Sequence, residues 1–391
     1  MRFEHFDGTT VHLAYCGNVH QAEDLKGVVS QLAEYAEPVR ERLGLDRLGI
    51  GLWLARDVVT ELVEDEREIR RLKDELALRG LETVTLNAFP YAGFHREVVK
   101  KDVYLPDWTD PARLRYTVDC ARVLAALLPD DARRGSVSTL PFAWRTPWQG
   151  EARDTARRAL ADLTAELASV ERESGRKIRV GFEPEPGCVV EDTVQAAREL
   201  GGVDPEFLGI CLDTCHLAVQ FEEPAQALRR LADAGLPIVK VQASSALHAD
   251  DPADPEARDA LARFVEPRFL HQTRTLREGT VTGVDDLPDA LAGGLDGDAP
   301  WRVHFHAPLH AAPQPPLRTT SGELTDALSA LLGGPDAVCD HIEVETYTWS
   351  VLPEQLRPHD RDSLVAGIAA ELAWTRERFL ELGLTHKEFA A

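Results

Sequence analysis

Short apolar runs rich in β-branched residues alternate with helical patterns from one end of this chain to the other. Such alternation indicates parallel strands joined by right-handed helical crossovers, and eight units of this kind close a barrel. The helices are recognised by apolar residues at spacings of three and four. The predicted strands span residues 11–16, 48–55, 81–89, 135–142, 178–185, 207–214, 237–244, 301–308 and 341–348. The clearest predicted helices span 57–79, 112–128, 152–174 and 190–200.

One of these nine strands must lie outside a regular barrel of eight. We place WRVHFHAP (301–308) outside it, because the stretch 245–300 before it is too long for an ordinary connection. We expect 245–300 to be an insertion before the last strand, with helices near 255–266 and 285–293. No linker rich in proline or serine divides the chain. The sequence therefore predicts a single TIM-barrel domain, (β/α)8, over residues 1–391.

Charge and composition exclude several kinds of protein. The net charge of −23 repels a phosphate backbone, so nucleic acid is not an expected partner. No apolar run of about 18 residues and no secretory signal occur, so we expect no membrane insertion. The six cysteines form no CxxC pair, which is typical of reduced thiols in a cytoplasmic protein. No GxSxG, Walker A or GxGxxG motif supports an esterase, an NTPase or a dinucleotide-binding protein.

Carboxylates lie at the ends of three predicted strands, where barrel enzymes keep their chemistry. Asp213 ends an apolar run and His216 follows within one turn. Glu183 and Glu185 lie two apart on one strand, and Glu345 lies near the end of the last one. Burying an unpaired carboxylate is costly, and carboxylates on one face repel unless a cation or a shared proton lies between them. The alternatives are a helix cap for Asp213, solvent-facing glutamates, or a glutamate bonded to a neighbouring polar residue.

Other strands offer residues that could complete such a site. His304 and His306 have a spacing that suits a metal pair, although they could be satisfied polar residues under the proline-rich loop that follows. Lys240 could hold an anionic substrate group, while a structural salt bridge is the plainer role. The segment 98–108 is either a lid or a solvated loop. Residues suited to sugar hydroxyls, each of which could instead cap a loop, are His12, Asn18, His20, Asn87 and His95.

With these motifs the chain resembles the xylose-isomerase-like superfamily, which includes ketose epimerases, sugar-phosphate isomerases and endonuclease IV. CLDTCH resembles the segment whose aspartate binds metal and whose histidine binds metal or substrate. FEPEPG and VETY resemble the two strand-end glutamate motifs. The resemblance implies that Asp213, Glu183 and Glu345 bind a metal, that the two glutamates form the acid/base pair, and that His216 contacts metal or substrate.

One position departs from that superfamily. Where the epimerases have a metal-binding histidine on the seventh strand, this chain has Gln242. An amide oxygen can still bind a hard cation such as Mn²⁺ or Mg²⁺. Alternatively His304 and His306 take the missing place, or the metal site has been lost.

A closer resemblance covers nearly the whole chain. The segments HLAYCGNVH, NAFPY, EPEPG, CLDTCH, KVQAS, HFHAP and VETYTWSVLP are similar to those of the EboE-type metabolite traffic proteins. This resemblance implies a role in small-molecule biosynthesis or traffic and adds little about mechanism.

The combined expectation is a metal-dependent isomerase or epimerase of a sugar, sugar phosphate or cyclitol-like metabolite, with Mn²⁺, Mg²⁺, Co²⁺ or Zn²⁺ as cofactor. Proton transfer through an enediolate and a hydride shift both remain open. The alternatives are a hydrolase like endonuclease IV and a non-catalytic metabolite-binding protein with a degenerate site. Homo-oligomers are expected by analogy only.

The expected catalytic residues are Glu183, Glu345 and His216. The expected metal ligands are Glu183, Asp213, Gln242, Glu345, His304 and His306. The expected substrate-binding residues are His12, Asn18, His20, Asn87, His95, Lys240 and Glu185.

Overall fold

The parallel strands of this chain close into a barrel, as the alternating pattern predicts. The computed structural model describes residues 1–132, 134–311 and 313–387. Each barrel strand is hydrogen-bonded in parallel to the next, and the last returns to the first. In order, these strands are β2 (Thr10–Cys16), β3 (Leu48–Trp53), β5 (Thr85–Asn87), β6 (Arg134–Thr139), β7 (Lys177–Phe182), β8 (Leu208–Asp213), β9 (Ile238–Ala243) and β15 (His341–Val344).

Three short strands extend this sheet. The predicted run 81–89 is interrupted, so that β4 (Leu81–Glu82) pairs with the start of β3 and β5 pairs with its end. In addition to these barrel pairings, β1 (Arg2–Glu4) lies antiparallel between β2 and β16 (Thr385–His386). Because helices cover the outer face of a parallel barrel, its strands are buried on both faces and read as continuous apolar runs.

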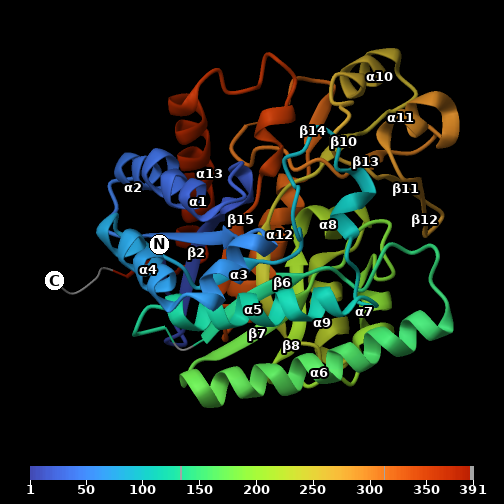
Figure 1. The fold of residues 1–391 in the computed structure, drawn as a ribbon. Helices are drawn as coiled ribbons and strands as arrows, with labels where there is room; N and C mark the ends of the chain where they lie inside the picture. Colours follow the sequence, from blue (N-terminus) through green and yellow to red (C-terminus); the bar gives the residue numbers. More distant parts are fainter. Residues whose placement is uncertain (133, 312, 388–391) are drawn as a thin grey trace.

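Helices surround the barrel (Figure 1). The predicted helix 57–79 is two helices, because Asp65 ends the first and accepts a hydrogen bond from the Arg67 backbone N–H at 2.9 Å. The helices are α1 (Leu25–Gln31), α2 (Glu37–Arg42), α3 (Arg56–Glu64), α4 (Glu66–Leu78), α5 (Pro111–Leu127), α6 (Gly150–Ser174), α7 (Thr193–Leu200), α8 (Thr214–Val219), α9 (Pro224–Asp233), α12 (Ser321–Leu332) and α13 (Arg361–Glu381). Shorter helical turns are η1 (Gly17–Val19), η2 (Leu32–Ala36), η3 (Lys100–Tyr104) and η5 (Tyr347–Val351).

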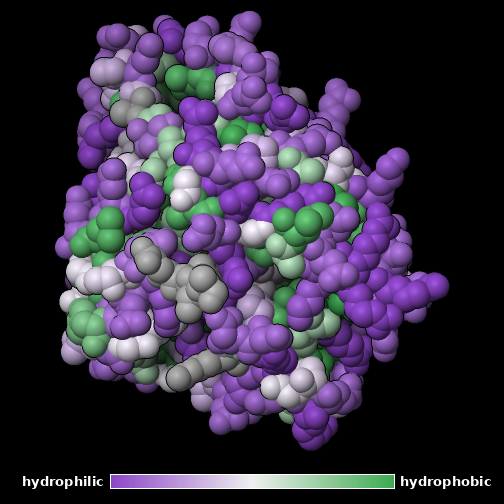
Figure 2. Space-filling view, turned by 90° about the vertical axis from the view of Figure 1, so that its left-hand side faces the viewer, coloured by the Kyte–Doolittle hydropathy of each residue, from purple (hydrophilic) through white to green (hydrophobic). Residues whose placement is uncertain are grey.

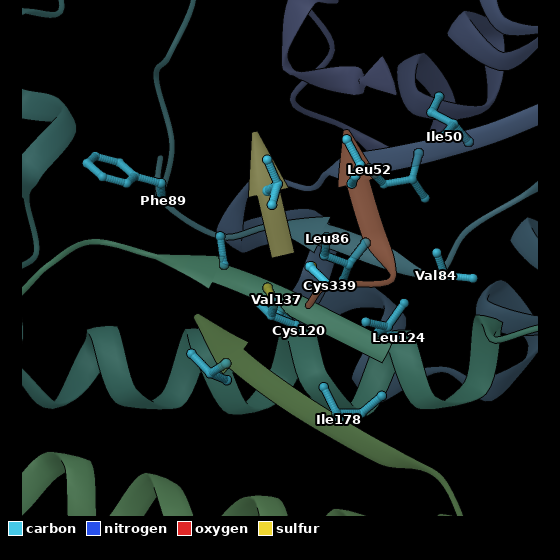
Figure 3. Close-up of a cluster of buried hydrophobic side chains, with 14 of the residues drawn as sticks. Ile50, Leu52, Val84, Leu86, Phe89, Cys120, Leu124, Val137, Ile178 and Cys339 are labelled. Carbon is cyan, nitrogen blue, oxygen red and sulfur yellow. The ribbon is translucent and has the colours of Figure 1, made fainter. Parts of the chain in front are cut away.

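The apolar core lies between these helices and the strands. In Figure 3, Cys120 and Leu124 of α5 lie over Val137 of β6 and Ile178 of β7. Polar side chains dominate the surface, with only scattered apolar residues on the face in Figure 2. No helix of the described residues is both long and apolar enough to cross a membrane.

A second, antiparallel sheet precedes the last barrel strand. Its order is β12 (Thr280–Val284), β11 (Thr273–Arg277), β13 (Trp301–Val303), β10 (Leu247–Ala249) and β14 (Leu317–Thr319). With α10 (Pro255–Ala262), α11 (Leu287–Asp289) and η4 (Ala290–Gly294) it lies at the upper right of Figure 1. Its core contains Leu261, Trp301 and Phe305. The run WRVHFHAP therefore lies outside the barrel, as predicted, but only its first three residues form a strand.

Candidate metal centre

Three carboxylates meet at the carboxyl ends of the barrel strands. Asp213 is the last residue of β8, Glu183 follows β7 directly and Glu345 follows β15 directly. Their side chains are buried, and one oxygen from each lies within 4.8 Å of the others. Closure of the barrel brings these strand ends together, although they are up to 162 residues apart in sequence (Glu183 to Glu345).

Several polar atoms at this point have no hydrogen-bond partner within the described part of the chain. They are Glu183 Oε2, Asp213 Oδ2, His306 Nε2 and both amide atoms of Gln242. A buried polar atom without a partner costs about 1–3 kcal/mol. Clustered oxygen and nitrogen acceptors are the donor set that a divalent cation requires, so these residues fit a metal ion.

His306 is oriented for this role by its other ring nitrogen. Its Nδ1 lies 2.8 Å from the Glu345 carbonyl oxygen, so Nδ1 carries the hydrogen and donates it. The lone pair is then on Nε2, which lies 3.7 Å from Asp213 Oδ2. A metal-binding histidine is commonly fixed in this way by a carbonyl group. His306, which lies beyond β13, thus presents Nε2 to Asp213 at the end of β8.

Asp213 is also a helix cap, which was the alternative interpretation of this residue. Its Oδ1 accepts from the His216 backbone N–H at 3.0 Å and from Ser244 Oγ at 2.7 Å. Burial alone raises the pKa of Asp213, but His216, His306 and these hydrogen bonds outweigh burial and lower it. The capping role accounts for the contacts of Oδ1, whereas Oδ2 faces His306.

Hydrogen bonds hold one of the two glutamates of the centre, and burial changes the pKa of both. Glu345 Oε1 accepts hydrogen bonds from the amides of Asn18 at 2.7 Å and Asn87 at 2.8 Å. Burial, followed by the neighbouring carboxylates, raises the pKa of both Glu183 and Glu345 well above the ordinary value. A nearby cation would reverse this effect, because it stabilises the charged carboxylates.

A second group of side chains lies beside the carboxylates. His216 Nε2 lies 3.0 Å from Glu185 Oε2 and 3.0 Å from His304 Nε2. Burial lowers the pKa of His216 to about 4 and that of His304 well below its ordinary value. Tyr104 donates its hydroxyl hydrogen to Glu185 Oε1 at 2.9 Å.

Residues of both groups line one cavity. The predicted residues that line it are Asn18, Asn87, Glu183, Glu185, His216, His304, His306 and Glu345. Its apolar wall consists of Phe89, Pro90, Phe94, Val103, Phe269 and Leu270, and Tyr104 and Tyr347 also line it.

Four residues expected to bind substrate do not line this cavity. His12 lies near the start of β2 in register with His341, the first residue of β15, and so at the opposite end of the barrel. His20 stacks on Tyr35 and bonds the Tyr15 hydroxyl at 3.1 Å.

The other two residues, His95 and Lys240, also lie outside the cavity lining. His95 bonds the Asn18 carbonyl oxygen through Nε2 at 2.8 Å and thereby supports the loop that carries Asn18. Lys240 is fully buried inside the barrel and pairs with Glu343 Oε2 at 2.7 Å. The plainer alternative for Lys240, a structural salt bridge, is therefore what the structure shows.

The site also contains residues that the sequence motifs did not indicate as site residues. Gln272, directly before β11, has no motif around it, yet its amide contacts Tyr104, Pro186 and His304. Tyr104 lies in the predicted lid segment 98–108. That segment is tied to the loop before β11, since the backbone N–H groups of Val99 and Lys100 each donate to the Arg268 carbonyl at 2.8 Å.

Comparisons with known proteins agree with this barrel. A family model described as a xylose isomerase-like TIM barrel matches residues 41–292, a range that ends before His304 and Glu345. A solved D-tagatose 3-epimerase-like protein is 13% identical with a TM-score of 0.51, covering 95% of this chain and 98% of that chain. A xylose isomerase-like TIM barrel protein from Mycobacterium smegmatis in complex with magnesium is 13% identical with a TM-score of 0.50, covering 94% and 97%.

At these identities the solved structures show the fold alone. No curated protein sequence is similar enough to this chain to count as a match. The family match covers well over half of the chain and includes β3 to β9 of the observed barrel. This chain therefore belongs to the xylose isomerase-like TIM barrel family.

Proposed function

We propose that this protein is a metal-dependent isomerase or epimerase acting on a sugar or cyclitol-like metabolite. The observation that carries the proposal is the set of buried donor atoms of Glu183, Asp213, His306 and Gln242 that have no hydrogen-bond partner among the described residues. Glu183 and His306 of this set line the cavity. The resemblance to ketose epimerases and the similarity to a D-tagatose 3-epimerase-like structure support the same chemistry.

Glu183, Asp213, Glu345 and His306 would hold the cation, with the Gln242 amide oxygen as a further ligand. Three carboxylates with one imidazole suit Mn²⁺, Mg²⁺ or Co²⁺, and a second imidazole would favour Zn²⁺. A bound divalent cation supplies stabilisation of negative charge on a substrate oxygen.

Glu183 and Glu345 would exchange a proton with the carbon next to a substrate carbonyl. They project from β7 and β15, which β8 and β9 separate, so they approach a bound substrate from different sides. One carboxylate would remove the proton and the other would return a proton to the same carbon. In an epimerase, the returned proton arrives on the opposite face of that carbon. Asn18 and Asn87 hold Glu345 Oε1, so Oε2 is the atom that would take or give the proton.

The cavity favours a substrate without a phosphate group. Lys100 is the only lysine or arginine among the described lining residues, and its Nζ already pairs with Asp286 at 2.5 Å. The lining carboxylates of Glu183, Glu185 and Glu345 would repel a phosphate. The aromatic side chains of the wall can pack on the apolar face of a sugar or cyclitol ring. We therefore place uncharged ketoses and inososes before sugar phosphates as substrates.

The test combines metal content with isotope exchange. Purified protein loaded with Mn²⁺ would be assayed on uncharged ketoses and inososes in deuterium oxide. Proton transfer predicts deuterium at the epimerised carbon. Glu183→Gln and Glu345→Gln should each lose about 10²–10⁴-fold in rate at saturating Mn²⁺.

Glu256→Gln, at the exposed start of α10, is the matched control and should keep full activity. Product without deuterium would favour a hydride shift. A wild-type protein that binds neither Mn²⁺ nor Mg²⁺ would overturn the proposal and favour a metabolite-binding protein.

We further propose that the chain acts as one domain in a cytoplasmic pathway of small-molecule biosynthesis or traffic. The segment after β13 contributes His304 and His306 to the lining of the barrel's cavity, which supports treating both sheets as one unit. The resemblance to EboE-type proteins supports the pathway.

A further inference from the structure

Three acceptor atoms face one another beside the carboxylates of the proposed centre. They are Glu185 Oε2, His216 Nε2 and His304 Nε2, and one ligand atom from each residue lies within 4.8 Å of the others. The distance between His216 Nε2 and His304 Nε2 is only 3.0 Å. A hydrogen bond between these two nitrogens requires a hydrogen on one of them, so the position of each ring hydrogen decides what this contact is.

The hydrogen of His216 is on its other nitrogen. Nδ1 lies 2.8 Å from the carbonyl oxygen of Pro184, which can only accept. Neutral His216 therefore carries its lone pair on Nε2, directed at His304 and Glu185.

The hydrogen of His304 is fixed by a longer chain of contacts. The Gln272 amide nitrogen lies 2.7 Å from the Pro186 carbonyl oxygen, so that atom must be the donor and the amide is correctly oriented. Gln272 Oε1 then accepts, and it lies 2.7 Å from His304 Nδ1. Neutral His304 consequently donates through Nδ1 and also has its lone pair on Nε2.

Glu185 completes the same arrangement. Its Oε1 accepts from the Tyr104 hydroxyl, which in turn accepts from Gln272 Nε2 at 3.0 Å. Its Oε2 is left 3.0 Å from His216 Nε2. The surrounding groups thus aim a carboxylate oxygen and two imidazole lone pairs at one point, and all three residues are buried.

We propose that Glu185, His216 and His304 bind a second divalent metal ion, separate from the one at Glu183, Asp213 and Glu345. Two imidazoles and one carboxylate are a donor set found in catalytic zinc sites that keep an open position. If a cation lay about 2.1 Å from each of the two ring nitrogens, the angle between the two nitrogens at the metal would be about 90°. Such an angle suits five- or six-coordination.

This second site would differ from the first in metal preference and in role. Its imidazole ligands favour Zn²⁺ or Co²⁺, whereas the carboxylate group favours Mn²⁺ or Mg²⁺. Because Glu185, His216 and His304 all line the cavity, a metal ion held by them would be accessible to a further oxygen of the ligand. The outer partners Pro184, Gln272 and Tyr104 would hold its ligands in place. This inference does not depend on isomerase activity, because it concerns metal binding alone.

The test is metal stoichiometry on the full chain. Protein freed of metal with a chelator would be titrated with Co²⁺ and followed by its visible absorption, with the content confirmed by mass spectrometry. Wild type should bind two equivalents, and His304→Ala and Glu185→Gln should each bind one. His310→Ala, a histidine of the same segment that stacks on Trp349 outside the cluster, should keep two.

Anomalous diffraction from wild-type crystals soaked in Zn²⁺ gives a second measurement that does not depend on any variant folding. Two peaks, one of them between His216 and His304, would support the proposal. A single peak at the carboxylates, or one equivalent of Co²⁺ in wild type and in His304→Ala alike, would overturn it and leave a shared proton between the two rings.

Discussion

Replacing Lys240 by methionine should destabilise the barrel strongly, although the residue lies outside the cavity. Lys240 and Glu343 are both fully buried, and Nζ lies 2.7 Å from Glu343 Oε2. At that distance the attraction is about 6 kcal/mol for an effective dielectric constant of about 20. Desolvation of the two charges offsets most of it, so the pair itself contributes little.

The loss on single substitution is larger because it leaves Glu343 buried without its cation. We expect Lys240→Met to lower the free energy of unfolding by about 3–5 kcal/mol. The double variant Lys240→Met/Glu343→Leu should recover most of that loss, since it removes both buried charges. Equilibrium unfolding in urea on wild type, both single variants and the double variant gives the coupling energy.

Two outcomes would refute this account of the barrel interior. One is a Lys240→Met protein within about 1 kcal/mol of wild type, which is the range of an exposed ion pair. The other is a double variant as unstable as the worse single variant, which would show that packing, and not charge, dominates.

Three further predictions concern other positions. Gly51→Ala should destabilise the fold by several kcal/mol, because the new Cβ would lie 1.4 Å from Glu343 Oε1. In a thermal melt, adding Glu343→Ala together with Lys240→Met should relieve the clash without leaving a buried charge unpaired. Burial raises the pKa of Glu371 to about 7, so the native state holds a proton that the unfolded state has released, and stability should fall by about 3 kcal/mol as pH rises from about 4.5 to 7. Glu371→Gln should flatten that dependence in urea unfolding at pH 5 and pH 8, and an unchanged slope would contradict the assignment. Tyr104→Phe removes the hydrogen-bond donor to Glu185 Oε1 and should weaken Co²⁺ binding at the proposed second site by about 10–100-fold, while a value equal to wild type would assign that hydroxyl no role.

The barrel and its strand-end carboxylates could be predicted from the sequence because both depend on local patterns. Buried parallel strands must be apolar along their length, so a carboxylate at the end of such a run, as at Asp213, stands out. Barrel closure then brings all such ends to one face, whatever their separation in sequence. The structure places His12, which was also expected at the site, near the start of β2 and so at the other end of the barrel.

The positions of residues outside the regular strand and helix units depend on tertiary packing. His304 and His306 lie beyond a three-residue strand of the second sheet, and nothing in their spacing indicated that one faces Asp213 and the other His216. Gln272 lacks any motif, yet it orients His304.

The sequence by itself thus determined the barrel, its strand order and the acidic ends of its strands, since periodicity and burial are properties of short segments. Only the tertiary structure decided which histidines enter the cavity, which ring nitrogen each presents, and that Lys240 is paired with Glu343 inside the barrel. These features depend on single contacts between segments far apart in the chain, and a contact of that kind leaves no periodic trace in the sequence.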